Sequence, residues 1–543
     1  MSIRTVRVAA AQFSNGTDVD QNLATVLRMI DLAALEHPDV LVLPEFCNHL
    51  SIYDDGQHAW DVAIELGTTS EPGPWIVAVS ERAARHECWI QLNCTVRRDG
   101  PSTSREPAPG RITNTNLMFS PSGRLVAAND KTVLMGAEGD FLSAAQVEAE
   151  LIETPFATVG TYACMDGVIA EVPRGLVLRG ATLLLNSLNS FALDEASLHV
   201  PVRAAENKVW VVACCKVGPL LPPEKVALFS RAMNVPPEFL NGAGESQIVA
   251  PDGTVVAMGP REGEAVVVAD IDLSAALDKR RPDGTDVLAA RRPEVYEPLS
   301  KPTPMIDEHG RAASITVDVV EGIDGIGAAD LTVLGELAIT PDDVASVSGR
   351  LDAGQVVVTS MKRDGIHLGV VIDSTGVIGE QRQLHRSERH GSWHTTLGDS
   401  LTPIDLAWGR LAIIVGDDAI YPETARLAAL ANCDVLAVPF TQLEAWETSI
   451  GLVERAAENR VCLVAANSGG ESLIVSLPPD FTLWSPSRER VFDGTINRPD
   501  VLRGPTPLRG VVHPARAVNR QISKGTNLVD GRPWQLAGSL TDR

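Results

Sequence analysis

Four residues in the first half of the chain could together perform nucleophilic hydrolysis. Glu45 directly follows the apolar run LVLP, Lys131 and Glu138 bound the segment KTVLMGAE, and Cys164 ends the run TVGTYAC. A cysteine thiolate can attack a carbonyl or nitrile carbon, a carboxylate can take the thiol proton, and an ammonium can stabilise the resulting oxyanion. Each residue also has a purely structural interpretation, because lysines and strand-end carboxylates usually reach solvent and buried cysteines usually only pack. Spacing alone does not show that the four side chains converge.

The segment around Cys164 predicts a turn between a strand and a helix. Met165, Asp166 and Gly167 follow the cysteine, and Asp166 is a suitable N-cap for a helix that begins at Val168. The positive end of a helix dipole favours an anion. We therefore expect this position to lower the pKa of the thiol and to favour the thiolate.

The elements that must position these residues occur twice. The segment RAAENKVWVVA at residues 203–213 recurs as RAAENRVCLVA at 455–465, an offset of 252 residues. Each copy alternates strand-like runs such as VRVAAAQF with helix-like segments such as NLATVLRMIDLAAL, which indicates an α/β layered domain. We therefore expect two tandem copies. The expected ranges are a first domain at 1–280, an irregular linker at 281–313, a second domain at 314–500 and a tail at 501–543 on another surface or mobile.

The ordered motifs LVLPEF, NDKTVL, TYACMDGVIAEVPR and RAAENKVWVVA resemble the nitrilase, or carbon–nitrogen hydrolase, superfamily. The resemblance implies an αββα four-layer sandwich in each copy and makes residues 1–280 the catalytic domain. It also implies that Glu45 is the general base, Lys131 stabilises the oxyanion, Cys164 is the nucleophile, and Glu138 supports the lysine. Asp166, two residues after the cysteine, is similar to amidase-type members, which favours amide or carbamoyl substrates over nitriles.

The second copy lacks this machinery. The offset of 252 residues places Gly416 opposite Cys164, while Glu336 is the counterpart of Glu45, and His385 or Arg386 is expected near the position of Lys131. The residues His385, Glu388, His390 and His394 are potential metal ligands by type, but their place in a degenerate loop favours a solvated segment. The resemblance further implies that the second copy replaces a partner subunit, giving an intramolecular pseudo-dimer that could assemble further.

Composition limits the remaining possibilities. The net charge of −24 disfavours nucleic acid and anionic membranes as partners, and a small-molecule amide is the expected substrate. No run approaches the about 18 apolar residues of a membrane span. The eight cysteines form no C-x-x-C pair and lie mostly in apolar runs, which is typical of a reduced, cytoplasmic protein without a zinc site. We expect a thiol amidohydrolase that needs no metal or organic cofactor. A nitrilase and a non-enzymatic scaffold with a vestigial first copy are the alternatives.

Overall fold

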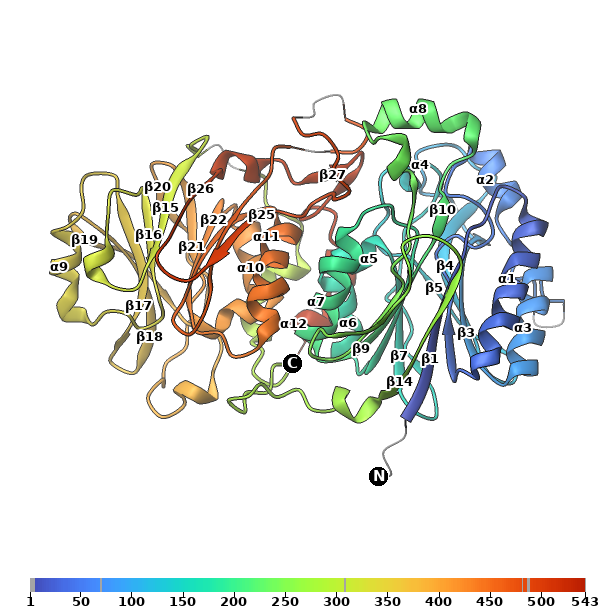
Figure 1. Cartoon of the computed structure of the whole chain (residues 1–543), viewed down its shortest axis with the longest axis horizontal. Coiled ribbons are helices and arrows are strands. Elements are labelled where there is room, and N and C mark those ends of the chain that lie inside the picture. Colours follow the sequence, from blue (N-terminus) through green and yellow to red (C-terminus); the bar gives the residue numbers. More distant parts are fainter. Residues whose placement is uncertain (1–4, 69–70, 307–308, 481, 486–488, 543) are drawn as a thin grey trace.

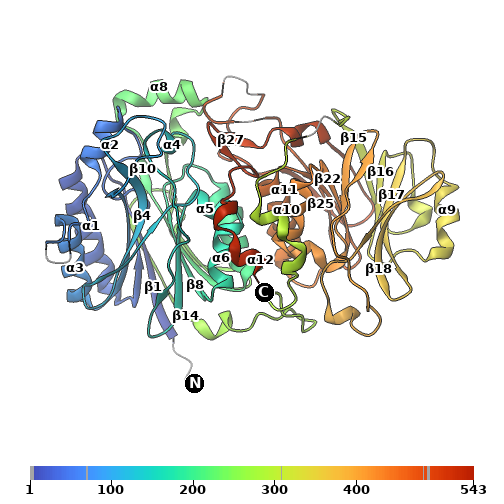
Figure 2. The same cartoon turned by 180° about the vertical axis from the view of Figure 1, so that it is seen from behind.

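The structure is a computed structural model that describes residues 5–68, 71–306, 309–480, 482–485 and 489–542. Its larger sheets form two pairs, one pair in each half of the chain (Figures 1 and 2). We call the part of the chain up to residue 280 the first copy and the part from residue 314 on the second copy. The two predicted tandem copies and the α/β class are therefore confirmed.

The first copy contains two six-stranded mixed sheets that pack face to face. One has the order β14 (Ala265–Asp272), β1 (Thr5–Gln12), β2 (Val40–Val42), β3 (Trp89–Arg98), β4 (Arg111–Phe119) and β5 (Leu125–Asp130). The other has the order β13 (Val255–Met258), β12 (Gln247–Val249), β9 (Trp210–Cys215), β8 (Leu183–Leu188), β7 (Thr158–Ala163) and β6 (Ile152–Glu153). Alternate apolar residues from both sheets, such as Val8 and Leu183, fill the space between them.

Helices cover the outer faces of these sheets and complete the four predicted layers (Figure 1). The helices α1 (Val19–Ala33) and α3 (Pro74–His86) pack on the first sheet, where Val26 and Ile30 are buried at helical spacing. On the second sheet lie α6 (Glu171–Leu178) and α7 (Val200–Asn207). The loops between these layers contain α2 (Gly56–Val62), α4 (Glu138–Phe141), α5 (Met165–Val168), α8 (Pro223–Met233), β10 (Val217–Pro219) and β11 (Asn241–Ala243).

The second copy repeats this arrangement. One sheet has the order β19 (Gly376–Arg382), β18 (Ile366–Asp373), β17 (Val356–Arg363), β16 (Leu331–Leu334), β15 (Ile315–Val320) and β26 (Leu508–Val512). The other has the order β20 (Ile404–Leu406), β21 (Gly409–Ile413), β22 (Val435–Phe440), β23 (Cys462–Asn467), β24 (Ser472–Ser476) and β25 (Asp500–Gly504). The helix α9 (Val344–Ser348) lies on the former sheet, and α10 (Pro422–Leu430) and α11 (Leu452–Asn459) lie on the latter. Strands β25 and β26 carry the second copy's sheets past the limit predicted at residue 500.

The two copies face each other through α6 and α7 on one side and α10 and α11 on the other (Figures 1 and 2). Their contacts are reciprocal. Arg174 pairs with Glu423, as Arg426 pairs with Glu171, and both pairs have N–O distances of 2.8–2.9 Å. In the same way Arg203 pairs with Glu458, and Arg455 with Glu206. Each of these four residues of the first copy is 252 residues from its equivalent, so one surface patch is used twice, as in a two-fold symmetric dimer.

The linker and the tail are packed on the two copies. Within the linker, Arg281 is buried and donates to Asp417 and Glu447, and the Tyr296 side chain is fully buried. In the tail, β27 (Gln521–Ser523) pairs with β28 (Thr526–Asn527), and α12 (Gly538–Thr541) contacts α6. The linker is irregular, as expected, because its described residues contain only short turns. Its contacts nevertheless hold the two copies together. Among the helices in the described ranges, none has the length and apolar composition that a membrane crossing requires.

Candidate active site

A cavity of about 350 Å³ opens at the carboxyl ends of the central strands of the first copy. Cys164, Glu138 and Glu195 line it together with Tyr53, which belongs to the segment after Glu45. Ser51 and Ile52 of the same segment also line the cavity. Strand ends are the usual ligand-binding edge of α/β sheets.

Glu45 follows β2 and is fully buried. Its Oε1 accepts hydrogen bonds from Lys131 Nζ at 2.8 Å and from Asn114 Nδ2 at 2.7 Å. Its Oε2 is buried and has no hydrogen-bond partner among the residues that the structure describes. One oxygen is thus held in place while the other keeps its lone pairs available for a proton.

Lys131 follows β5 and its ammonium joins the two predicted carboxylates. Nζ donates to both oxygens of Glu138, at 2.9 and 2.8 Å, as well as to Glu45. Burial alone would lower the pKa of Lys131, but Glu138 and Glu45 outweigh it and hold that pKa well above its ordinary value. The lysine is therefore a permanent cation in the wall of the site.

Cys164 stands at the turn between β7 and α5 with φ of 48° and ψ of −108°. The left-handed φ is unfavourable for a residue with a side chain, and two hydrogen bonds hold it: the backbone N–H donates to Ser187 O at 3.0 Å and to Asn186 Oδ1 at 3.1 Å. The side chain faces the cavity. This places the sulfur at a tight strand–helix turn, as predicted.

The predicted effect of the turn on the thiol is wrong. Burial raises the pKa of Cys164 well above its ordinary value, Glu45 and Glu195 raise it further, and Lys131 only partly offsets them. The helix that follows has four residues, so its dipole is small. The resting group is therefore a thiol, and attack by sulfur requires a base to take its proton.

Glu195 is a site residue that the sequence analysis missed. Its Oε1 lies 3.9 Å from Cys164 Sγ, within reach of the S–H donor, and its Oε2 is buried without a partner in the described part of the chain. Burial raises the pKa of Glu195 to about 7, and His199 acts in the opposite direction. Its only sequence signal is the repeat, which pairs it with Glu447 at the offset of 252 residues.

Asp166 acts as a clamp rather than as a simple helix cap. Its carboxylate accepts hydrogen bonds from the backbone N–H groups of Thr132, Val133 and Ala163, at 2.7–3.2 Å. This ties the loop that carries Lys131 to the turn that carries Cys164. The clamp therefore sets the relative position of the ammonium and the sulfur.

The clamp also identifies the equivalent residues of the second copy. Asp418 accepts hydrogen bonds from the backbone N–H groups of Leu384 and His385, as Asp166 does from Thr132 and Val133. The residue before this pair is therefore Gln383 in the second copy and Lys131 in the first. Gln383 therefore occupies the lysine position, and His385 and Arg386, which were expected near it, follow two and three residues later.

Residues of the second half complete the wall of the cavity. Leu483, Trp484, Ile496 and Asn497 line it, and so do Ile522, Ser523 and Lys524 around β27. Gly136 N donates to Thr526 Oγ1 at 2.7 Å, which fixes this segment to the loop between Lys131 and Glu138. The cavity is thus formed by both copies.

The model of the carbon–nitrogen hydrolase family matches residues 7–281. A nitrilase from Pyrococcus abyssi is 25% identical over 292 residues, which cover 54% of this chain and 99% of that protein. An omega-amidase (NIT2) from Bos taurus is 26% identical over 310 residues, covering 55% and 99% of the two chains. The solved structure of Nit3 from Saccharomyces cerevisiae is 22% identical with a TM-score of 0.41, covering 51% of this chain and 93% of that one.

The family match covers about half of the chain and spans both sheets of the first copy. The chain therefore belongs to the carbon–nitrogen hydrolase family of the nitrilase superfamily, a family of enzymes that act on non-peptide C–N bonds.

Proposed function

We propose that the first copy hydrolyses a small amide or carbamoyl compound through a thioester on Cys164. One observation carries this proposal: Cys164 and Glu138 line one cavity, and Lys131 joins Glu138 to Glu45, whose Oε2 has no partner among the described residues. Cys164 is the nucleophile, Glu45 the general base and Lys131 the oxyanion partner. Glu138 holds the ammonium of Lys131.

The reaction then has two halves. As Sγ attacks the carbonyl carbon, Glu45 takes the thiol proton and the carbonyl oxygen becomes an oxyanion beside Lys131. The C–N bond breaks, and the proton on Glu45 passes to the departing amine or ammonia. Water next attacks the thioester, Glu45 takes a proton from it, and the C–S bond breaks. The carboxylic acid leaves and the proton returns to sulfur.

The high thiol pKa explains why Glu45 is needed. A cysteine with a lowered pKa would react as a preformed thiolate, whereas Cys164 is protonated at rest. Glu45 Oε1 is held by Lys131 and Asn114, so proton transfer falls to the open Oε2. The base and the oxyanion partner are thus fixed by the same hydrogen-bond network.

The lining of the cavity favours an uncharged substrate with an apolar group. Many of its walls are apolar, including Ile52, Met135, Phe191, Leu221, Phe229 and Trp484. Among the described lining residues the cations are already paired: Lys524 contacts Asp140 at 3.0 Å, and His199 contacts Glu454 at 2.8 Å. A carboxylate on the substrate would be buried without a partner, which is costly.

The experiment compares ammonia release from hexanamide, adipamic acid and hexanenitrile, which share a six-carbon chain. We expect hexanamide to be the best substrate, with kcat/KM at least about 10-fold above that of adipamic acid, because the latter carries an uncompensated carboxylate. Hydrolysis of the nitrile without hydrolysis of the amide would make the enzyme a nitrilase and overturn the proposal. A preference for adipamic acid would refute only the inference that the cavity favours an uncharged substrate, and not the assignment as an amidase.

A further inference from the structure

The catalytic positions of the second copy hold a cluster of metal-ligand type. Glu336 is the counterpart of Glu45, and the offset of 252 residues pairs His390 with Glu138. His367 replaces Asn114: the backbone N–H of Lys131 donates to Asn114 O, and that of Gln383 donates to His367 O. Two positions that bind the lysine or the base in the first copy are thus histidines in the second.

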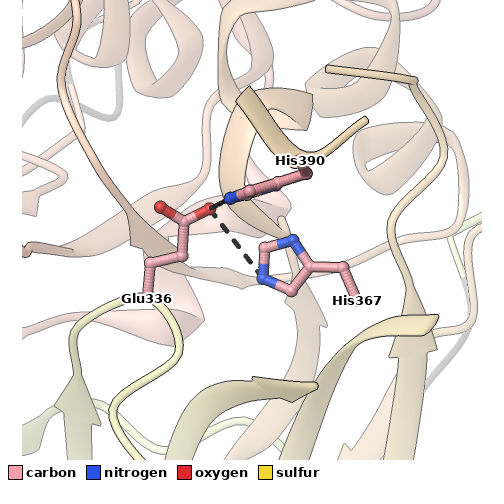
Figure 3. A group of neighbouring side chains, drawn as sticks. All are labelled: Glu336, His367 and His390. Carbon is pink, nitrogen blue, oxygen red and sulfur yellow. Dashed lines mark ion pairs between the residues drawn. The ribbon is translucent and has the colours of Figure 1, made fainter. Parts of the chain in front are cut away.

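These three side chains point toward one another (Figure 3). The Nε2 atoms of His367 and His390 each lie 3.8 Å from the same oxygen, Glu336 Oε1. This separation is too long for a hydrogen bond. Ligands about 2.0–2.2 Å from one zinc ion lie roughly 3.4 Å apart at the tetrahedral angle. The three ligand atoms all lie within 4.8 Å of one another, so binding one ion needs the side chains to move together by about an ångström or less.

The imidazoles are in the form that binds a metal. His367 Nδ1–H donates to Gln383 Oε1 at 2.6 Å, which leaves a lone pair on Nε2, where the Ser360 hydroxyl now donates at 2.9 Å. His390 Nδ1 is buried and has no hydrogen-bond partner within the described ranges.

The expected solvated segment is therefore not what the structure contains. His385, His390 and His394 are all buried, and only Glu388 of the four candidate ligands is exposed. His385 contacts Asp418 at 2.7 Å and lies outside the cluster. The candidate ligands are Glu336, His367 and His390. Of these, only His390 was named as a potential metal ligand from the sequence.

The neighbouring charges leave room for a cation. Arg389 donates to both oxygens of Glu336, at 2.6 and 2.8 Å, and Thr441 donates to Oε2. A carboxylate has about four lone-pair sites, so Oε1 keeps one. Arg389 also binds Asp417, which Arg281 joins to Glu447. This chain of three carboxylates and two guanidiniums has a net negative charge.

Gly416 occupies the position of Cys164 in the second copy, and the cluster leaves no room there for a side chain. It keeps the left-handed turn of Cys164, with φ of 53° against 48°. A Cβ atom at this position would lie 2.5 Å from Glu336 Oε1 and 3.0 Å from His367 Cε1. Glycine is therefore required for the carboxylate and the imidazole to occupy the centre, as expected of a rebuilt site.

We propose that the second copy binds one divalent transition-metal ion of the zinc class through Glu336 Oε1, His367 Nε2 and His390 Nε2. Two imidazoles and one carboxylate favour zinc, cobalt, iron or nickel over magnesium and calcium, which prefer oxygen ligands. Three protein ligands leave at least one coordination position open for water or another ligand.

The test uses Co²⁺ as the probe on the full chain carrying Cys164→Ser, which removes the competing thiol that lines the cavity of the first copy. We expect one equivalent of Co²⁺ per chain, with visible absorption of four- or five-coordinate cobalt. His367→Gln and His390→Gln should each weaken binding at least about 100-fold, more than loss of an outer-shell partner would. His58→Gln, in the first copy and away from the cluster, should bind as tightly as the parent.

Folding of the variants is checked by circular dichroism. A second measurement does not depend on cobalt spectra: Zn²⁺ should raise the melting temperature of the parent but not of His390→Gln. Absence of stoichiometric binding would overturn the proposal. So would Co²⁺ binding by both glutamine variants that is as tight as that of the parent. Binding that is present with Cys164 and lost in Cys164→Ser would place the metal at the first copy instead, and would overturn it too.

Discussion

At the scale of single residues, Lys131 joins the base to its supporting carboxylate. Replacing it with alanine removes the cation proposed to stabilise the oxyanion and leaves Glu45 and Glu138 buried together without it. We expect Lys131→Ala to lower kcat by about 100- to 1,000-fold, as loss of an oxyanion partner does. Steady-state ammonia release measures this, with Lys301→Ala on the surface as the control. A loss of only two- or threefold would remove Lys131 from the chemistry.

Glu195 and Cys164 are coupled through their charges. The carboxylate of Glu195 raises the pKa of the thiol, so Glu195→Gln should lower it. The pH profile of Cys164 alkylation by iodoacetamide should then shift to lower pH, followed by peptide mass spectrometry. Glu153→Gln, exposed on the first copy, should leave the profile unchanged. An unchanged profile in Glu195→Gln would show that the two groups do not interact.

Glu45, Lys131 and Cys164 could be predicted because each lies in a contiguous motif at the end of a strand, and Glu138 follows Lys131 by seven residues. Asn114 and Glu195 could not be, because their side chains reach the site from segments far from those motifs. The thiol pKa was mispredicted for a related reason: the helix after Cys164 is visible in the sequence, but the burial and the carboxylates that oppose it arise only on folding.

At the scale of elements, the clamp formed by Asp166 holds two loops together. Asp166→Ala would leave three buried backbone N–H groups without an acceptor, and each costs about 1–3 kcal/mol. We expect it to lower the free energy of unfolding by about 3 kcal/mol or more and to lower kcat as well, because Lys131 and Cys164 lose their relative position. Denaturant unfolding and ammonia release measure the two effects.

The matched control is Asp418→Ala, which breaks the equivalent clamp in the second copy. It should reduce stability while preserving kcat for the amide. If Asp418→Ala reduced kcat as much as Asp166→Ala does, the loss would reflect general destabilisation and not the position of the catalytic groups.

The strands and helices of the two sandwiches followed from apolar periodicity and the repeat, but the linker and the tail did not. Arg281 and Tyr296 are buried by contacts with the second copy, and β27 lies against the cavity of the first. Such segments have no regular period. Their place is fixed by surfaces that exist only when both copies are assembled, so the sequence suggested only a connector and a tail that lies on another surface or is mobile.

At the scale of the whole molecule, the reciprocal ion pairs make the second copy a structural partner of the first. A fragment of residues 1–280 would expose Arg174, Arg203 and Glu206, would remove their partners in the second copy, and would lose the wall around Trp484. Breaking buried pairs is strongly destabilising. We expect this fragment to be insoluble, self-associating or poorly active by light scattering and ammonia release. A monomeric fragment with the full-length rate would mean that the second copy is not its partner.

The central claim is that the Cys164 sulfur attacks the substrate, and Cys164→Ser tests it most directly. The change replaces one atom and leaves the Glu45–Lys131–Glu138 network unaltered. The measurement is ammonia release from the best amide by the wild-type and variant chains, with intact-mass detection of an acyl adduct in quenched wild-type samples. The account predicts at least a 1,000-fold loss in kcat, an order of magnitude set by other covalent hydrolases, and an acyl adduct on Cys164. Near wild-type turnover by Cys164→Ser would contradict it.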